Sequence, residues 1–150
     1  MASRFCALLL FSLVAYAAAP GERAEYIGGT RPELRIHNSG YIGTADPVYF
    51  SFLSKSTQIR IPFERINLIE YGQKVNRRYI TAAVISPLFL MAKKRDHFLT
   101  VGFQDDDGTQ QAMIFRVDKN DIRAALVCLE ARTGQQVQYQ DEEAQKAGKG

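Results

Sequence analysis

The sequence contains few of the side chains that hold metals or form disulfides. Its 150 residues include two histidines, two cysteines and no tryptophan. Zinc sites need Cys and His ligands clustered at short spacing, whereas His37, His97 and Cys128 lie far apart along the chain. The sequence also has no glycine-rich phosphate loop. We therefore predict a protein without a metal ion or cofactor, and with a core that folds without a disulfide.

The sequence also lacks a strong excess of one charge. It has 19 basic and 16 acidic residues, which gives a net charge of +3 at pH 7. A nucleic-acid-binding domain is expected to carry a strongly basic face. The near balance of charges therefore predicts that the partner is not a nucleic acid.

One apolar run stands at the N-terminus. Residues 5–17 follow Arg4 and end in a small-x-small cleavage pattern at 15–17, which is typical of a signal peptide. The run breaks at Pro20, and a bilayer-spanning helix needs about 20 apolar residues. We therefore predict a signal peptide over residues 1–17, export to the periplasm or the medium, and no membrane span in the mature chain.

The rest of the chain is long enough for one domain. Residues 18–30 and 139–150 are polar and contain few large apolar side chains. Such composition favours segments that do not pack into a core. The sequence therefore predicts a mobile N-terminal segment over 18–30, a single folded domain over 31–138 and a polar tail over 139–150.

Several short segments alternate apolar and polar residues, which is the pattern of half-buried strands. Turn residues such as Asn38-Ser39-Gly40 separate them. Pro62 has no N–H to donate to a neighbouring strand, so the strand that contains it is predicted to lie at a sheet edge or to end there. The four predicted strands are residues 33–37, 47–54, 57–63 and 65–75.

Two further alternating segments, 97–104 and 109–117, flank the sequence DDDG at 105–108. Alternating segments joined by a short Asp-Gly-containing loop predict a β-hairpin. Three adjacent carboxylates also suggest a calcium loop, but the interleaved glycines and distal glutamate of such a loop are missing. We therefore interpret DDDG as a solvated hairpin tip.

Near the C-terminus the spacing of apolar residues changes to that of a helix, in which they recur at i, i+3, i+4 and i+7. Asp118 or Asn120 is expected to cap this helix, and Gly134 to end it in a left-handed conformation. The predicted fold class is mainly β with one C-terminal helix, as an antiparallel roll or partly open barrel capped by helix 119–133. The apolar face of that helix consists of Ile122, Ala125, Leu126 and Leu129.

The segment TQIRIPFERINLIEYGQKV (57–75) resembles the strand-turn-strand of bacterial pleckstrin-homology-like domains, in which an Ile-Pro-aromatic strand leads into an IEYG strand. Residues 93–134 resemble the closing hairpin and C-terminal helix of those domains. The resemblance implies a small barrel capped by a helix and a scaffold that binds lipids, peptides or proteins. The loop over 38–47 departs from the phosphoinositide-binding members because it has no Lys or Arg. Inositol-phosphate binding is therefore not predicted.

The apolar residues 80–92 have cations on both sides. One interpretation is a core strand over 79–85, a turn at Ser86-Pro87 and a further segment packed on the barrel. The other is an exposed interaction rim, residues 74–78 and 86–95, that faces a protein or an anionic lipid surface. The pattern alone leaves both open. The candidate binding residues of the rim are Lys74, Arg77, Arg78, Leu88, Phe89, Leu90, Lys93, Lys94 and Arg95.

These features favour a non-catalytic, exported binding or structural module of the cell envelope that contacts a protein or lipid surface through the rim. The alternative is a small metal-dependent or hydrolytic enzyme that uses His37, His97 and Asp105–Asp107, and it requires these groups to converge in one cleft. A third hypothesis is a subunit whose edge strand, 57–63, pairs with another chain.

Overall fold

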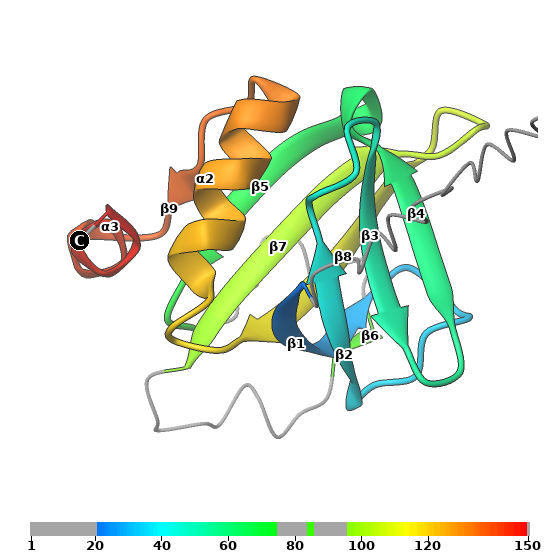
Figure 1. Cartoon of the computed structure of the whole chain (residues 1–150), viewed down its shortest axis with the longest axis horizontal. Helices are drawn as coiled ribbons and strands as arrows, with labels where there is room; N and C mark the ends of the chain where they lie inside the picture. The colour runs from blue at the N-terminus through cyan, green and yellow to red at the C-terminus, as the bar shows by residue number, and fades with distance from the viewer. Residues whose placement is uncertain (1–20, 75–83, 86–95, 150) are drawn as a thin grey trace, which may run out of the picture.

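The computed structural model describes residues 21–74, 84–85 and 96–149, and this part of the chain is mainly β. One nine-stranded open sheet is followed by two C-terminal helices (Figure 1). Neighbouring strands follow the order β4-β3-β2-β1-β8-β7-β5-β9, and β6 pairs with β1. Only the short pairing of β5 with β9 is parallel among these strands. The strands are β1 (Glu22–Gly29), β2 (Asn38–Gly43), β3 (Tyr49–Ser54), β4 (Gln58–Pro62), β5 (Ile66–Gly72), β6 (Val84–Ile85), β7 (His97–Gln104), β8 (Gln110–Val117) and β9 (Gln138–Tyr139).

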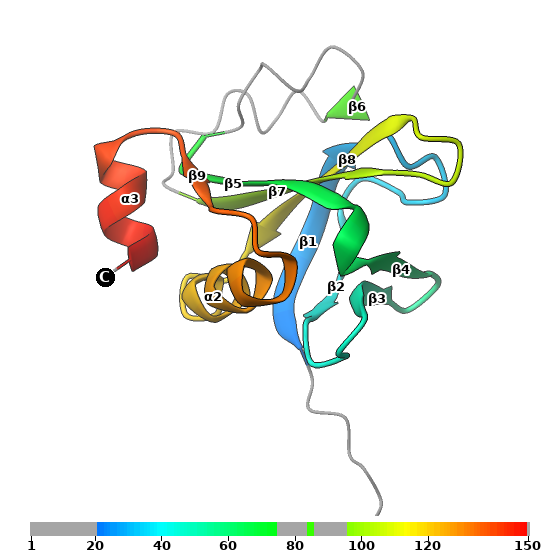
Figure 2. The same ribbon diagram turned by 90° about the horizontal axis from the view of Figure 1, so that it is seen from above.

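The sheet bends so that its two halves share one core. β3 and β8 are separated by two strands in the sheet. Nevertheless, the ring centroid of Phe115 on β8 lies 6.2 Å from that of Phe50 and 5.0 Å from that of Phe52, both on β3. A register shift in β1 between Tyr26 and Gly28 lies in this region, and such bulges increase local twist. Figure 2 shows β2, β3 and β4 on the same side of β5 and β7 as helix α2 (Ile122–Thr133).

Helix α2 closes the core on that side. It buries Ile122, Ala125, Leu126 and Leu129, which confirms the apolar face predicted from the helical period. Gly134 ends it in the left-handed conformation (φ 70°), and its N–H donates to the carbonyl of Glu130 at 2.9 Å. The helix begins three residues later than predicted, because the Asp118 carbonyl accepts the N–H groups of Asp121 and Ile122 in a turn.

Several strand predictions are confirmed. β7 and β8 form the predicted hairpin, with Leu99 paired with Phe115 and Val101 with Met113. β4, which ends at Pro62, lies at one edge of the sheet as expected. β5 ends at Gly72.

The predicted mobile N-terminal segment is wrong over most of its length, because Glu22–Gly29 forms β1 in the middle of the sheet. Ala24 and Tyr26 face the core, while Arg23 and Glu25 alternate with them on the outer face. The sequence of this segment is polar because its first half buries only one face, whereas Tyr26 and Ile27, on opposite faces, are both buried. The strand predicted over 33–37 is absent; bends and turns occupy this stretch, and His37 has a positive φ of 68°.

The prediction of a single C-terminal helix and a polar tail is also wrong. A second helix, α3 (Glu142–Lys149), follows β9. Ala144 is fully buried, and Gly148 lies so close to Tyr139 that an added Cβ would approach its ring to 2.5 Å. Small residues on one face therefore let this otherwise polar helix pack against the body of the domain. No helix in the described ranges is long and apolar enough to cross a membrane.

Three predictions fall outside the described residues. They are the signal peptide over 1–17, the conformation of the apolar residues 86–92, and most of the interaction rim.

Candidate functional site

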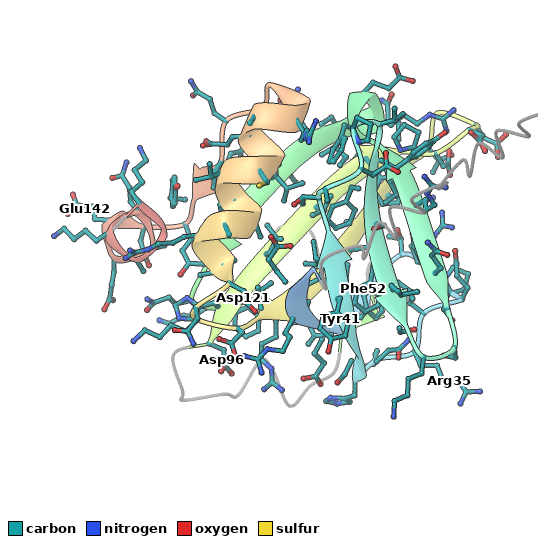
Figure 3. All side chains as sticks on the ribbon, in the orientation of Figure 1. Arg35, Tyr41, Phe52, Asp96, Asp121 and Glu142 are labelled. Carbon is teal, nitrogen blue, oxygen red and sulfur yellow. The ribbon has the colours of Figure 1, made fainter. Side chains whose placement is uncertain are left out.

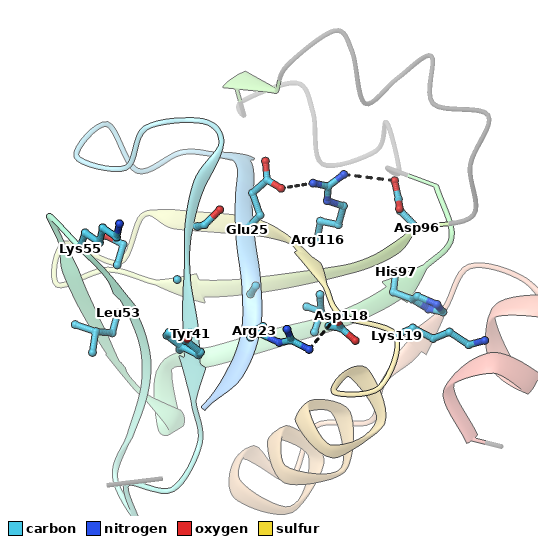
Figure 4. A pocket seen from close by; sticks show the side chains of 15 residues that line it. Arg23, Glu25, Tyr41, Leu53, Lys55, Asp96, His97, Arg116, Asp118 and Lys119 are labelled. Atoms are coloured by element: carbon cyan, nitrogen blue, oxygen red, sulfur yellow. Dashed lines mark hydrogen bonds and ion pairs between the residues drawn. The ribbon is translucent and has the colours of Figure 1, made fainter. Parts of the chain in front are cut away.

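A groove of about 780 Å³ lies at the end of the molecule where α2 begins (Figure 4). Residues from β1, β2 and β3 line one part of it, and the end of β8, the start of β7 and residues 118–119 line the other. Figure 3 shows Tyr41, Asp96 and Asp121 at this same end. The groove therefore collects side chains from segments that are far apart in the sequence.

An exposed apolar pair forms the part of the groove over β2 and β3. Tyr41 on β2 pairs with Leu53 on β3, and their exposed fractions are 43% and 51%. Arg23 on β1 pairs with Tyr41 on its other side. Because side chains alternate between the faces of a strand, these three residues lie on the outer face, opposite the core residues Ala24, Ile42 and Phe52.

A chain of ion pairs crosses the groove next to this row. Glu25 on β1 lies 2.7 Å from Nδ1 of His37 and also pairs with Arg116 on β8. Arg116 in turn lies 3.8 Å from a carboxylate oxygen of Asp96, just before β7. Figure 4 shows Glu25, Arg116 and Asp96 in line. The network joins three strands at the end where the groove opens.

Arg23 connects β1 to the start of α2. Its guanidinium lies 3.3 Å from Asp118 and 3.8 Å from Asp121, and its backbone N–H donates to Asp121 at 3.1 Å. The Asp118 N–H donates to the Arg23 carbonyl at 3.1 Å. These bonds hold residues 118–121 against the edge of the groove.

His97 is the histidine that lines the groove, next to Asp96 in the chain. Its Nδ1 lies 2.5 Å from the hydroxyl of the buried Tyr71. Burial lowers the pKa of His97, and the positive charge of Lys119 lowers it further, while Asp96 and Asp118 oppose the change. Burial also raises the pKa of Tyr71 to about 12. The tyrosine therefore keeps its proton, and its hydroxyl shares a hydrogen bond with Nδ1 of an imidazole whose neutral form is favoured.

Two lysines mark the two sides of the groove. Lys55 follows β3, and Lys119 follows β8. Within the described part of the chain, neither takes part in an ion pair or a side-chain hydrogen bond. Their charges are therefore available to a partner.

Of the predicted rim residues, the structure describes Lys74 alone, which is exposed just beyond β5. Gly72, the last residue of β5, pairs with Phe98 on β7, so the chain leaves β5 close to the place where it enters β7. Asp96 directly follows Arg95 and lines the groove. The described residue that directly follows the predicted rim, Asp96, is therefore part of the groove.

The residues of the enzyme hypothesis do not converge. His97 begins β7 and Asp105 follows its last residue, so eight strand residues, about 26 Å in length, separate them. Asp105 accepts the N–H groups of Asp107 and Thr109 and shapes the hairpin tip, while Asp106 pairs with Arg65. Among the described residues, no three His, Cys, Asp or Glu side chains gather closely enough to hold a metal ion.

Sequence reasoning missed most of the groove. The sequence pattern assigns Tyr41 to a loop, Leu53 to a strand, and Arg23 and Glu25 to a mobile segment. The alternation of Arg23, Ala24, Glu25 and Tyr26 is the signal that could have found the strand. Comparison with protein-family models and with curated proteins finds no match to this chain.

Proposed function

We propose that this chain is an exported binding module of the cell envelope, with a pleckstrin-homology-like fold, that contacts a protein or lipid surface without catalysis. The contact is made by the interaction rim, residues 74–78 and 86–95. The observation that carries the proposal is the groove, which is lined by the exposed pair Tyr41 and Leu53 and by Asp96, the residue that directly follows the rim. That end combines exposed apolar side chains with cations, as interaction surfaces do.

The order of elements supports the pleckstrin-homology-like assignment. β1 to β4 form one antiparallel meander, β5, β7 and β8 form a second set of neighbours, and α2 follows directly. The two segments that carry the resemblance, 57–75 and 93–134, contribute β4, β5, β7, β8 and α2. A fold of this kind is a scaffold, so the proposed function depends on its surface rather than on the fold alone.

The proposal is tested by replacing Leu88, Phe89 and Leu90 together with serine. Val127→Ser serves as the matched control, because Val127 is the most exposed large apolar residue described, at 63%, and lies on α2. Circular dichroism first establishes whether each variant folds. Cosedimentation with envelope membranes of the producing cell, and separately with phosphatidylglycerol vesicles, then measures binding.

We expect the triple variant to fold but to lose cosedimentation. Val127→Ser is expected to fold and to cosediment like the wild type. Loss with vesicles as well as membranes identifies a lipid surface, and loss with membranes alone identifies a protein. A triple variant that cannot fold places residues 88–90 in the core and overturns the rim. A triple variant that folds and binds as before also overturns it.

A further inference from the structure

The groove brings exposed apolar side chains and charged groups together in one defined arrangement. We propose that it binds an extended, acidic segment of a partner protein, with at least one large apolar residue between two acidic ones. This inference rests on the proposed function and names the class of partner.

The apolar residues of the groove favour a side chain of the partner. Tyr41 and Leu53 lie directly opposite each other on neighbouring strands and are about half exposed. Next to them, Ser39 pairs with Glu25, and its small side chain leaves a hollow in the surface. An apolar residue inserted there covers the Tyr41 ring, and exposed tyrosines beside hollows are frequent hot spots of peptide and protein binding.

The charges of the groove favour an acidic partner. Its three carboxylates, Glu25, Asp96 and Asp118, are each paired with Arg23 or Arg116. Lys55 and Lys119 are left as the cations with no partner in the described part of the chain. Two acidic side chains of a ligand complement these two lysines, and such pairs set the orientation of a bound segment.

The same charges disfavour a phospholipid headgroup at the two arginines of the groove. A phosphate brought against Arg23 or Arg116 also meets the carboxylates of Asp118, Glu25 and Asp96, which repel it. A peptide meets them differently, because its backbone N–H groups donate to carboxylate oxygens. The alternating charges therefore fit a polypeptide with its own donors and acidic side chains.

The positions of the lysines set the length of the segment. Lys55 follows Ser54, which pairs with Gly40, and Lys119 follows Asp118, which is bonded to Arg23. Ser54, Gly40, Ala24 and Val117 form one row across β3, β2, β1 and β8, which gives three interstrand spacings. Lys55 and Lys119 lie beyond opposite sides of this row, about three residues apart in the strand direction. Along the surface of the sheet, the two lysine backbones are therefore about 17 Å apart. An extended peptide rises about 3.3 Å per residue, so about five residues bridge them.

The experiment selects binders from a phage-displayed library of random peptides, using the purified chain as bait. Recovered peptides are synthesised, and their affinities are measured by fluorescence polarisation for three variants. These are Tyr41→Ser with Leu53→Ser, Lys55→Gln with Lys119→Gln, and the control Val48→Ser. Val48 is 52% exposed and does not line the groove.

We expect the selection to enrich peptides with two acidic residues four to six positions apart and an apolar residue between them. Each groove variant is expected to weaken their binding about tenfold or more, and the lysine variant also to reduce its salt dependence. Val48→Ser is expected to bind normally. No acidic enrichment, or equal binding by the groove variants, overturns the proposal.

A failure of the peptide proposal is distinguishable from a failure of the proposed rim, because the groove variants leave residues 88–90 unchanged. If phosphatidylglycerol vesicles bind through Tyr41 and Leu53 while no acidic peptide is recovered, the peptide proposal is wrong and the envelope module stands.

Discussion

The hydroxyl of Tyr71 lies 2.5 Å from Nδ1 of His97, and the two ring planes are only 8° from parallel. Tyr71 is fully buried on β5, whereas His97 begins the neighbouring strand at the rear of the groove. The bond holds the imidazole ring in place beside the buried tyrosine. Burial lowers the pKa of His97 and so favours its neutral form in the folded state.

Lys119→Gln is expected to raise the pKa of His97, because it removes the nearby positive charge that disfavours the imidazolium. The pKa is expected to stay below its ordinary value of 6.5, since burial is the larger cause of the shift. An NMR titration of the imidazole Cε1–H signal measures the change. Lys55→Gln, on the other side of the groove, is the control and should leave the titration unchanged. Equal titrations in the two variants would contradict the role of Lys119 in lowering the pKa of His97.

Stability is expected to fall as the pH drops below 6.5 in a way that depends on His97. The unfolded chain takes up a proton at this residue near pH 6.5, whereas the folded chain, with its lowered pKa, resists protonation. The stabilising effect is therefore complete above pH 6.5 and is lost on acidification towards the folded pKa. Urea unfolding of the wild type and His97→Gln between about pH 5 and pH 8 checks this. The difference in unfolding free energy should shrink at acidic pH; a constant difference would be inconsistent with it.

Leu129→Ala is expected to lower the free energy of unfolding by between about 2 and 5 kcal/mol, since it leaves a cavity beneath α2. Leu129 is fully buried, whereas Val127 on the same helix is 63% exposed. Val127→Ala should therefore change stability by no more than about 0.5 kcal/mol. Chemical denaturation of both variants measures the contrast. Similar losses in the two would mean that α2 does not cover the core in this orientation.

Ala144→Glu is expected to detach α3, because a carboxylate at this fully buried position loses its hydration without a partner. The control is Gln145→Glu, which adds the same charge one residue later on the exposed side of the helix. Limited proteolysis should cut Ala144→Glu faster within residues 140–149, with the sheet and α2 still intact. Equal resistance of the two variants would show that α3 does not dock through Ala144.

The elements that could be predicted from the sequence are those whose two faces differ clearly. The hairpin alternates Leu99, Val101 and Phe103 with polar or small residues, and α2 carries four apolar residues on one stripe. Their burial against the main core follows from this spacing, whereas the burial of Phe98 and Ile114 on the other face of the hairpin does not. The end of α2 could also be predicted, because Gly134 occupies a left-handed position that favours glycine.

The elements that sequence reasoning missed are stabilised by tertiary contacts instead. β1 contains the charged residues Arg23 and Glu25, and ion pairs with Arg116, Asp118 and Asp121 compensate these two charges in the folded protein. α3 contributes only Ala144, Ala147 and Gly148 to its packed face, so its amphipathic pattern is weak in large apolar residues. The groove was missed because strand order and register decide which side chains meet, and neither is apparent from a local pattern.

The most direct measurement of the central claim is hydrogen–deuterium exchange of the purified chain, free and bound to envelope membranes of the producing cell. The account predicts slower exchange on binding in residues 74–78 and 86–95 and in the groove strands β2 and β3, with the hairpin tip unchanged. Unchanged exchange in all these segments, or protection confined to the sheet edge at β4, would contradict it.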